Sequence, residues 1–170
     1  MGRCARHAPG RTQLAGLVGL LWLGTALGCA PSRHTPPPYN EDPVAAEALE
    51  ARAEAHCASR PIDTRTEPVR PFVTDGCSVW PDGANYVECC VEHDVLYWCG
   101  GTSEERLAAD DAFGRCVAEG SSAFLGGWMR LGVRLGGHPL FPTHYRWGYG
   151  LDYLGGYPTA ADRGAATAES

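Results

Sequence analysis

His93 and two nearby aspartates have the residue types of a general-base site. Asp94 follows His93 directly, and Asp110 lies further along the chain. A carboxylate that accepts a hydrogen bond from histidine fixes the ring tautomer and stabilises the imidazolium formed when the ring takes a proton. On a helix, Asp94 would point about 100° away from His93 and could hold a metal ion beside it. We therefore expect a histidine base, a carboxylate partner and an adjacent cation site.

A short segment before this histidine has the composition of a calcium-binding loop. Residues 74–78 are Thr-Asp-Gly-Cys-Ser. Calcium prefers several oxygen ligands, including carboxylates and the backbone carbonyls of glycine-containing loops. The loop contains Cys77, and Cys90 lies just before His93 in the chain. A disulfide between these cysteines would place the loop over the start of the helix that carries the histidine.

Two helices are expected to position these residues. Apolar residues recur at helical spacing over residues 86–99, and a Gly-Gly pair ends this helix. Thr102 with Glu105 forms a capping box, which predicts a second helix through about residue 119. The short glycine turn makes the two helices antiparallel neighbours.

In such an antiparallel pair, one alignment would have a chemical consequence. A disulfide between Cys89 and Cys116 would hold His93 opposite Asp110. Asp111 is the alternative partner, because it is adjacent to Asp110. Tyr97 could support the carboxylate or be an ordinary core residue, and Asp82 could be a loop ligand or a turn residue. His56, His138 and His144 have no evident partner in the sequence, so no role is assigned to them.

The N-terminal residues have the pattern of an export signal. Residues 1–28 contain three arginines followed by an uncharged apolar run that is too short to span a bilayer comfortably. The run ends before Cys29 in a sequence that resembles the lipobox of bacterial lipoproteins. We expect Cys29 to carry lipid and to hold the protein at the outer membrane or in the periplasm. The alternative is an ordinary cleaved signal and a secreted protein.

Export to an oxidising compartment favours disulfides over free thiols. Apart from Cys4 and Cys29, the chain has six cysteines, an even number that predicts three disulfides with fifteen possible pairings; they are Cys57, Cys77, Cys89, Cys90, Cys99 and Cys116. The alternative is a zinc site built from cysteines and His93.

The remaining sequence divides into a tether, a domain and a tail. Residues 29–43 are rich in proline and are expected to be an extended tether, followed by a domain over residues 44–157 and a flexible tail over residues 158–170. Residues 42–58 are predicted to form a helix and residues 60–84 a structured loop, whereas the stretch from Ser121 shows no clear period.

Charge restricts the partners. The formal charge is −6 without a single lysine, and removal of the three arginines of residues 1–28 would leave about −9. Phosphates repel such a chain, so nucleic-acid binding is not expected. A membrane contact would have to depend on local basic or aromatic patches rather than on net charge, and we expect a monomer. Residues 124–150 contain three arginines, six aromatic residues and no acid. These aromatics either lie at the lipid–water interface or pack over the helix pair.

The motif CCxxHDxxY over residues 89–97 resembles the active-site helix of secreted phospholipases A2. The second helix is similar as well, since Asp110 precedes Cys116 by six residues. Residues 74–77 with Pro81 and Asp82 resemble the calcium loop of prokaryotic members. The resemblance covers roughly residues 74–117, and this chain departs from animal members in having Leu96 where they have a cysteine.

This resemblance implies a mainly α-helical fold with a disulfide-linked antiparallel helix pair and a calcium-binding loop. It implies the pairs Cys77–Cys90 and Cys89–Cys116, which leaves Cys57 with Cys99. It also implies the roles of six residues. His93 would be the general base, Asp110 would orient it and Tyr97 would support Asp110, while calcium would be bound by Asp94, Asp75 and the Gly76 carbonyl.

The activity implied by the resemblance is calcium-dependent hydrolysis of the sn-2 acyl ester of phospholipids, and the partner it implies is a phospholipid membrane surface. His93 would deprotonate a water molecule, and calcium would stabilise the oxyanion. The alternative is a phospholipase A2-like lipoprotein that acts as a binding or structural module without turnover.

Overall fold

The computed structural model describes residues 35–60 and 67–159, and in these ranges it is mainly helical, with four helices and no strand. The helices are α1 (Pro43–Ala58), α2 (Val87–Trp98), α3 (Ser103–Gly120) and α4 (Ala123–Gly136). The expected mainly helical fold is therefore confirmed. The predicted signal segment, Cys29 and most of the predicted tail lie outside the described residues. No described helix is both long enough and apolar enough to cross a membrane.

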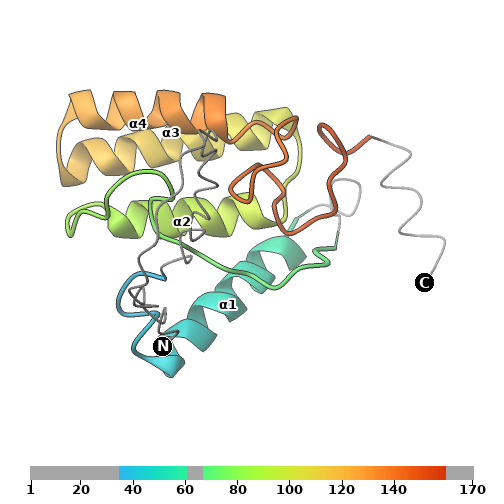
Figure 1. Cartoon of the computed structure of the whole chain (residues 1–170), viewed down its shortest axis with the longest axis horizontal. Helices are drawn as coiled ribbons and strands as arrows, with labels where there is room; N and C mark the ends of the chain where they lie inside the picture. Colours follow the sequence, from blue (N-terminus) through green and yellow to red (C-terminus); the bar gives the residue numbers. More distant parts are fainter. Residues whose placement is uncertain (1–34, 61–66, 160–170) are drawn as a thin grey trace, which may run out of the picture. The chain divides into compact units, whose positions relative to one another are not determined.

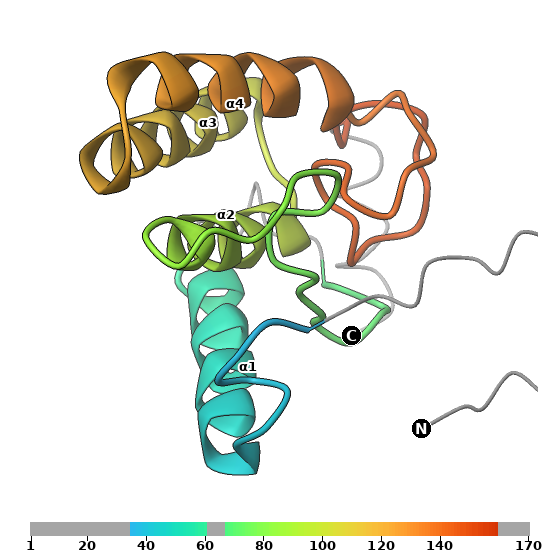
Figure 2. The ribbon, with the colours of Figure 1, turned by 60° about the vertical axis from the view of Figure 1, so that its left-hand side comes forward.

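The helices are arranged in three layers, with α2 in the middle layer. α3 and α4 lie side by side on one side of α2, and α1 packs against its other side (Figure 1). The rotated view shows the same order (Figure 2). Thr102 accepts a hydrogen bond from the backbone N–H of Glu105 and forms the predicted capping box at the start of α3. Gly100 and Gly101 have φ of 64° and 136°, which allows the tight turn between α2 and α3.

Three disulfides cross-link α2 to α1, to the loop before α2 and to α3. They link Cys57 to Cys99, Cys77 to Cys90, and Cys89 to Cys116, which are the pairs that the resemblance implies. The first joins the end of α1 to the end of α2, the second joins the loop to α2, and the third joins α2 to α3. With all six thiols in disulfides, none remains as a ligand for the alternative zinc site.

α4 is the element that the sequence pattern did not reveal. Its glycines lower helix propensity by about 1 kcal/mol each relative to alanine, and they obscure its period. The helix forms because it packs closely on α3. A Cβ atom on Gly126 would lie 2.3 Å from the backbone oxygen of Gly114, so the two backbones touch at this point. Tertiary packing therefore outweighs weak local propensity in α4.

This close contact gives a prediction with a neighbouring control. Gly126→Ala is expected to lower the free energy of unfolding by about 2 kcal/mol, because the new methyl group overpacks the contact between α3 and α4. Gly127 has nothing within 4 Å of its added Cβ, so Gly127→Ala is expected to raise stability by about 0.5–1 kcal/mol through helix propensity alone. Urea unfolding measures both. Equal effects at the two positions would contradict the close contact.

The segment after α4 folds back over the helix pair. Arg146, Trp147 and Tyr149 are buried, and the Trp147 indole donates to the Gly101 carbonyl at 3.0 Å. The Tyr97 and Trp147 rings meet edge to face at 4.9 Å. For these residues of the 124–150 stretch, the packing interpretation is the correct one.

The described part of the proline-rich segment also differs from an extended tether. Residues 37–41 form turns, Pro36 is fully buried, and Tyr39 packs against the core. The Tyr39 hydroxyl donates to Glu88 on α2 at 2.7 Å. Residues 35–42 are therefore part of the folded domain, because Tyr39 packs against the core and is hydrogen bonded to α2.

Candidate active site

His93 and Asp110 face each other across the helix pair. The distance from His93 Nε2 to the nearer Asp110 carboxylate oxygen is 3.0 Å, and both side chains are buried. The Cys89–Cys116 disulfide lies close to this contact in sequence on both helices. Among the described residues, no group hydrogen bonds to the other ring nitrogen, Nδ1. That nitrogen is left for a water molecule or a substrate.

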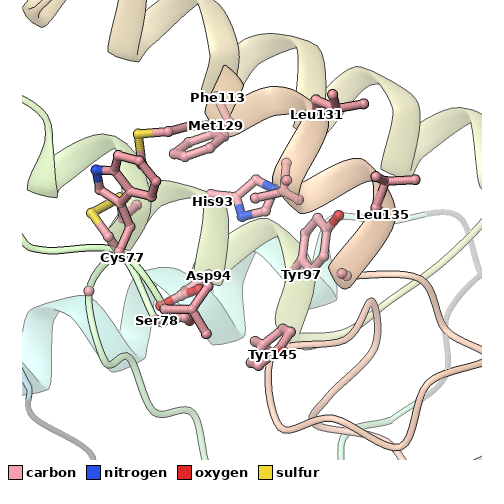
Figure 3. Close-up of a pocket in the computed structure, with 18 of the residues that line it drawn as sticks. Cys77, Ser78, His93, Asp94, Tyr97, Phe113, Met129, Leu131, Leu135 and Tyr145 are labelled. Atoms are coloured by element: carbon pink, nitrogen blue, oxygen red, sulfur yellow. A yellow bond between two sulfur atoms is a disulfide. The ribbon is translucent and has the colours of Figure 1, made fainter. Parts of the chain in front are cut away.

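Tyr97 lies one helical turn after His93 and contacts the same carboxylate. Its hydroxyl donates to Asp110 at 2.5 Å, and its ring lies 4.0 Å from the His93 ring, centroid to centroid. Figure 3 shows His93, Asp94 and Tyr97 on the same helix beneath α4. The carboxylate oxygen that contacts His93 is therefore held by two groups from α2.

The second Asp110 oxygen faces two arginines that the sequence reasoning missed. Arg134 Nε of α4 lies 3.3 Å from it, and Arg106 of α3 lies 3.8 Å away. The Arg106 guanidinium also donates to the Tyr97 hydroxyl at 3.2 Å. Arg106 precedes Asp110 by four residues on one helix, a spacing that could have revealed it. Arg134 could not be found without predicting α4.

Asp111 does not compete for the histidine. Its carboxylate pairs at the surface with Arg130 at 2.6 Å and with Arg134 at 3.2 Å. Asp110 is fully buried beside His93, whereas the Asp111 side chain is 41% exposed. Of the two candidates, the structure brings Asp110 to the histidine.

Arg134 and Arg130 provide a matched test of this arrangement. Arg134→Ala is expected to lower the free energy of unfolding by about 2 kcal/mol or more, because it leaves a buried carboxylate without its nearest cation. Arg130→Ala, one turn earlier on the same helix, breaks an exposed pair and should cost less than about 1 kcal/mol. Chemical denaturation compares the two. A larger loss at Arg130 would show that the buried pair does not stabilise the site.

Burial sets the protonation of the histidine and the tyrosine. Removal from water lowers the pKa of His93 below its usual value of 6.5, although Asp110 opposes this effect. Burial and the Asp110 charge raise the pKa of Tyr97, which stays protonated as a donor. His93 is therefore neutral at physiological pH, as a general base must be.

Asp94 is placed beside the expected calcium loop. Its carboxylate is buried and accepts a hydrogen bond from the Thr74 hydroxyl at 2.6 Å. Asp75 accepts a hydrogen bond from Ser78, and its carboxylate lies 3.3 Å from Nε2 of His144, a histidine with no evident partner in the sequence. Gly76 has a φ of +70°, which favours glycine.

Asp82 closes the loop as a turn residue would. One of its carboxylate oxygens accepts the backbone N–H of Cys77 at 2.9 Å. A Cβ atom on Gly76 would lie 2.4 Å from this carboxylate, so a glycine is needed there. The loop is thus held by its own acidic residue.

The electrostatics of Asp94 fit a hard cation. Burial raises the pKa of Asp94 well above its usual range, and the nearby charges of Asp75 and Asp82 raise it further. No arginine or histidine pairs with Asp94 in the described part of the chain. Within the same ranges, however, no three His, Cys, Asp or Glu side chains lie close enough together to hold a metal ion. A cation here would therefore need backbone or water oxygens in addition to carboxylates, as calcium commonly has.

An apolar cavity of about 310 Å³ lies over the histidine. The charged or titratable groups at its base are His93 and Asp94, with the Tyr97 ring beside them (Figure 3). Its walls are apolar side chains of the loop and of α4, among them Val79, Trp80, Trp128, Leu131, Val133 and Leu135. The cavity has the size and lining of a site for an apolar chain.

No protein-family model, curated protein or solved structure matches this chain. Inferences about its function therefore depend on the geometry of the site and on the motif that resembles phospholipases A2.

Proposed function

We propose that the protein hydrolyses the sn-2 acyl ester of phospholipids in a calcium-dependent reaction. The observation that carries the proposal is the buried contact between His93 and Asp110, with His93 and Asp94 both lining one apolar cavity. Such a hydrolysis requires a base, a cation and space for an acyl chain, and the candidate residues for the base and the cation both line this cavity.

In the proposed reaction, Nδ1 of His93 takes a proton from a water molecule as that water attacks the ester carbonyl. Asp110 stabilises the imidazolium through Nε2, and the buried tyrosine hydroxyl keeps the carboxylate in place. The proton then passes to the leaving alcohol oxygen as the ester bond breaks. The products are a fatty acid and a lysophospholipid.

Asp94, Asp75 and the Gly76 carbonyl are the residues proposed to hold Ca²⁺. When bound, Ca²⁺ supplies positive charge for the substrate phosphate and for the developing oxyanion. The buried Asp94 carboxylate, which has no cationic partner among the described residues, supports this assignment, because a charge in that position needs a cation.

The proposed activity is tested with mixed phospholipid vesicles. Fatty-acid release is measured with calcium and with a chelator. We expect fatty-acid release that requires calcium and that leaves a lysophospholipid with its sn-1 acyl chain intact. Calcium binding without any release would favour the alternative, a non-catalytic binding or structural module.

The pH profile gives a further prediction. The general base must be neutral, and burial lowers the pKa of His93 below 6.5. Hydrolysis at saturating calcium should therefore fall as pH drops, with a midpoint below pH 6.5. The measurement is kcat/KM against pH on a soluble ester, which reports the free enzyme. A midpoint above 6.5 would contradict the buried environment of the base.

A further inference from the structure

One buried hydroxyl contacts two of the three residues proposed to bind calcium. The Thr74 side chain is buried, and its hydroxyl donates to the Asp94 carboxylate at 2.6 Å. The same oxygen accepts the backbone N–H of Gly76 at 3.2 Å. The third proposed residue, Asp75, directly follows Thr74 in the chain. A single side chain therefore connects the loop to the buried carboxylate of α2.

The direction of this hydroxyl is fixed. An ionised carboxylate can only accept a hydrogen bond, so the single proton of the Thr74 hydroxyl points to Asp94. The oxygen lone pairs are then left for the Gly76 N–H. Because threonine is branched at Cβ, its χ1 angle is also restricted. The hydroxyl therefore keeps one orientation between the carboxylate and the loop backbone.

Both peptide groups that flank Gly76 are held by side chains. The N–H of the preceding peptide group donates to Thr74, and the N–H of the following one, which belongs to Cys77, donates to Asp82 at 2.9 Å. Gly76 itself has a φ of +70°. The direction of the Gly76 carbonyl, a proposed calcium ligand, is thus set by Thr74 on one side and by Asp82 on the other.

Other contacts anchor the loop without reaching the Asp94 side chain. The Tyr149 hydroxyl donates to the Val73 carbonyl at 2.7 Å, and the Cys77–Cys90 disulfide joins the loop to α2. Asp82 bonds only to the loop backbone. Among the described residues, Thr74 is the one side chain that donates a hydrogen bond to the Asp94 carboxylate. The alignment of this carboxylate with the loop therefore depends strongly on Thr74.

Resting on the proposed function, in which Asp94, Asp75 and Gly76 hold Ca²⁺, we propose that Thr74 is a positioning residue of the calcium site. Its hydroxyl holds the α2 carboxylate and the loop backbone in the arrangement that the ion requires, before the ion binds. Groups that orient the ligands of a metal in this way contribute to its affinity although they do not touch it.

The proposal is tested by isothermal titration calorimetry of the full chain with calcium. Thr74→Val keeps the branched shape but removes the hydroxyl, and it is expected to weaken calcium binding about tenfold to a hundredfold. Thr74→Ser keeps the hydroxyl and should recover most of the affinity. Circular dichroism checks that each variant is folded. If the valine variant does not fold, the smaller Thr74→Ala makes the same comparison.

The matched control is Thr102→Val. Thr102 also uses its hydroxyl in a hydrogen bond, at the N-terminal cap of α3. Its loss should lower the stability of the fold but leave the calcium affinity unchanged. A second measurement needs no metal. In the absence of calcium, the Gly76 amide should exchange with solvent faster in Thr74→Val, because it loses its acceptor, and Thr102→Val should not have this effect.

Equal calcium affinity of Thr74→Val and the unmodified chain would overturn the proposal. Equal weakening by Thr102→Val would do the same, because the effect would then be general destabilisation. A serine variant as weak as the valine variant would assign the effect to shape rather than to the hydroxyl, and would also overturn it. The expected affinities without any fatty-acid release would remove the proposed activity but leave the role of Thr74, whereas a chain that binds no calcium would overturn both.

Discussion

Replacing His93 with glutamine is expected to lower calcium-dependent fatty-acid release by about a thousandfold, within the usual range for loss of a general base. Glutamine keeps the approximate size of the side chain but cannot take a proton from water. The variant should keep the fold, because Asp110 still has Tyr97 and two arginines around it. The measurement is the initial rate on mixed vesicles at saturating calcium.

The control for this variant is His56→Gln. His56 lies on α1, away from the cavity lining, so its loss should leave the rate unchanged. Urea midpoints of both variants should stay close to that of the unmodified chain. Retained activity in the His93 variant would remove the proposed mechanism, because no other described histidine contacts Asp110.

Asp94→Asn is expected to have two effects of opposite sign. It should abolish the stabilisation by calcium and lower the hydrolysis rate by about a hundredfold or more, because the cation site loses its buried charge. In the absence of calcium, it should instead raise the free energy of unfolding by about 1 kcal/mol or more at neutral pH. The physical reason is that burial raises the pKa of Asp94, so its charged form is unfavourable in the folded protein.

The sign of the stability effect follows from linkage. The pKa of Asp94 is higher in the folded protein than its ordinary value of about 3.8 in the unfolded chain. The carboxyl group therefore contributes most to the free energy of unfolding below pH 3.8, and this contribution is lost as pH rises through the pKa of the folded state. The gain from asparagine should therefore appear at neutral pH and vanish in acid. Thermal unfolding with and without calcium measures it, and Asp152→Asn at an exposed position is the control. An unchanged calcium response in Asp94→Asn would place the cation elsewhere.

The helix pair and its facing side chains were predictable because their signals are local. The capping box, the Gly-Gly turn and the apolar spacing define α2 and α3 within one or two residues. Once the pair is antiparallel, a disulfide between Cys89 and Cys116 sets the alignment that places His93 opposite Asp110. The disulfide pairing could be inferred only through the resemblance, since six cysteines alone leave fifteen possibilities.

α4 and its contributions could not be predicted in the same way. Its glycines weaken the local signal, and it forms because Gly126 approaches the α3 backbone. Without α4, neither the role of Arg134 nor the apolar roof of the cavity can be deduced. The aromatic residues in α4 and after it were equally ambiguous, since exposure of Trp128 and burial of Trp147 depend on tertiary packing alone.

All three disulfides lie at or before Cys116, so the part of the chain up to this residue is cross-linked and the part after it is not. The base, its carboxylate and the loop belong to the first portion. The roof over them and one arginine belong to the second. Reductants would therefore act first on the alignment of the reacting groups. Local unfolding of the part after Cys116 alone would open the cavity to water, but the disulfides would still hold His93 opposite Asp110.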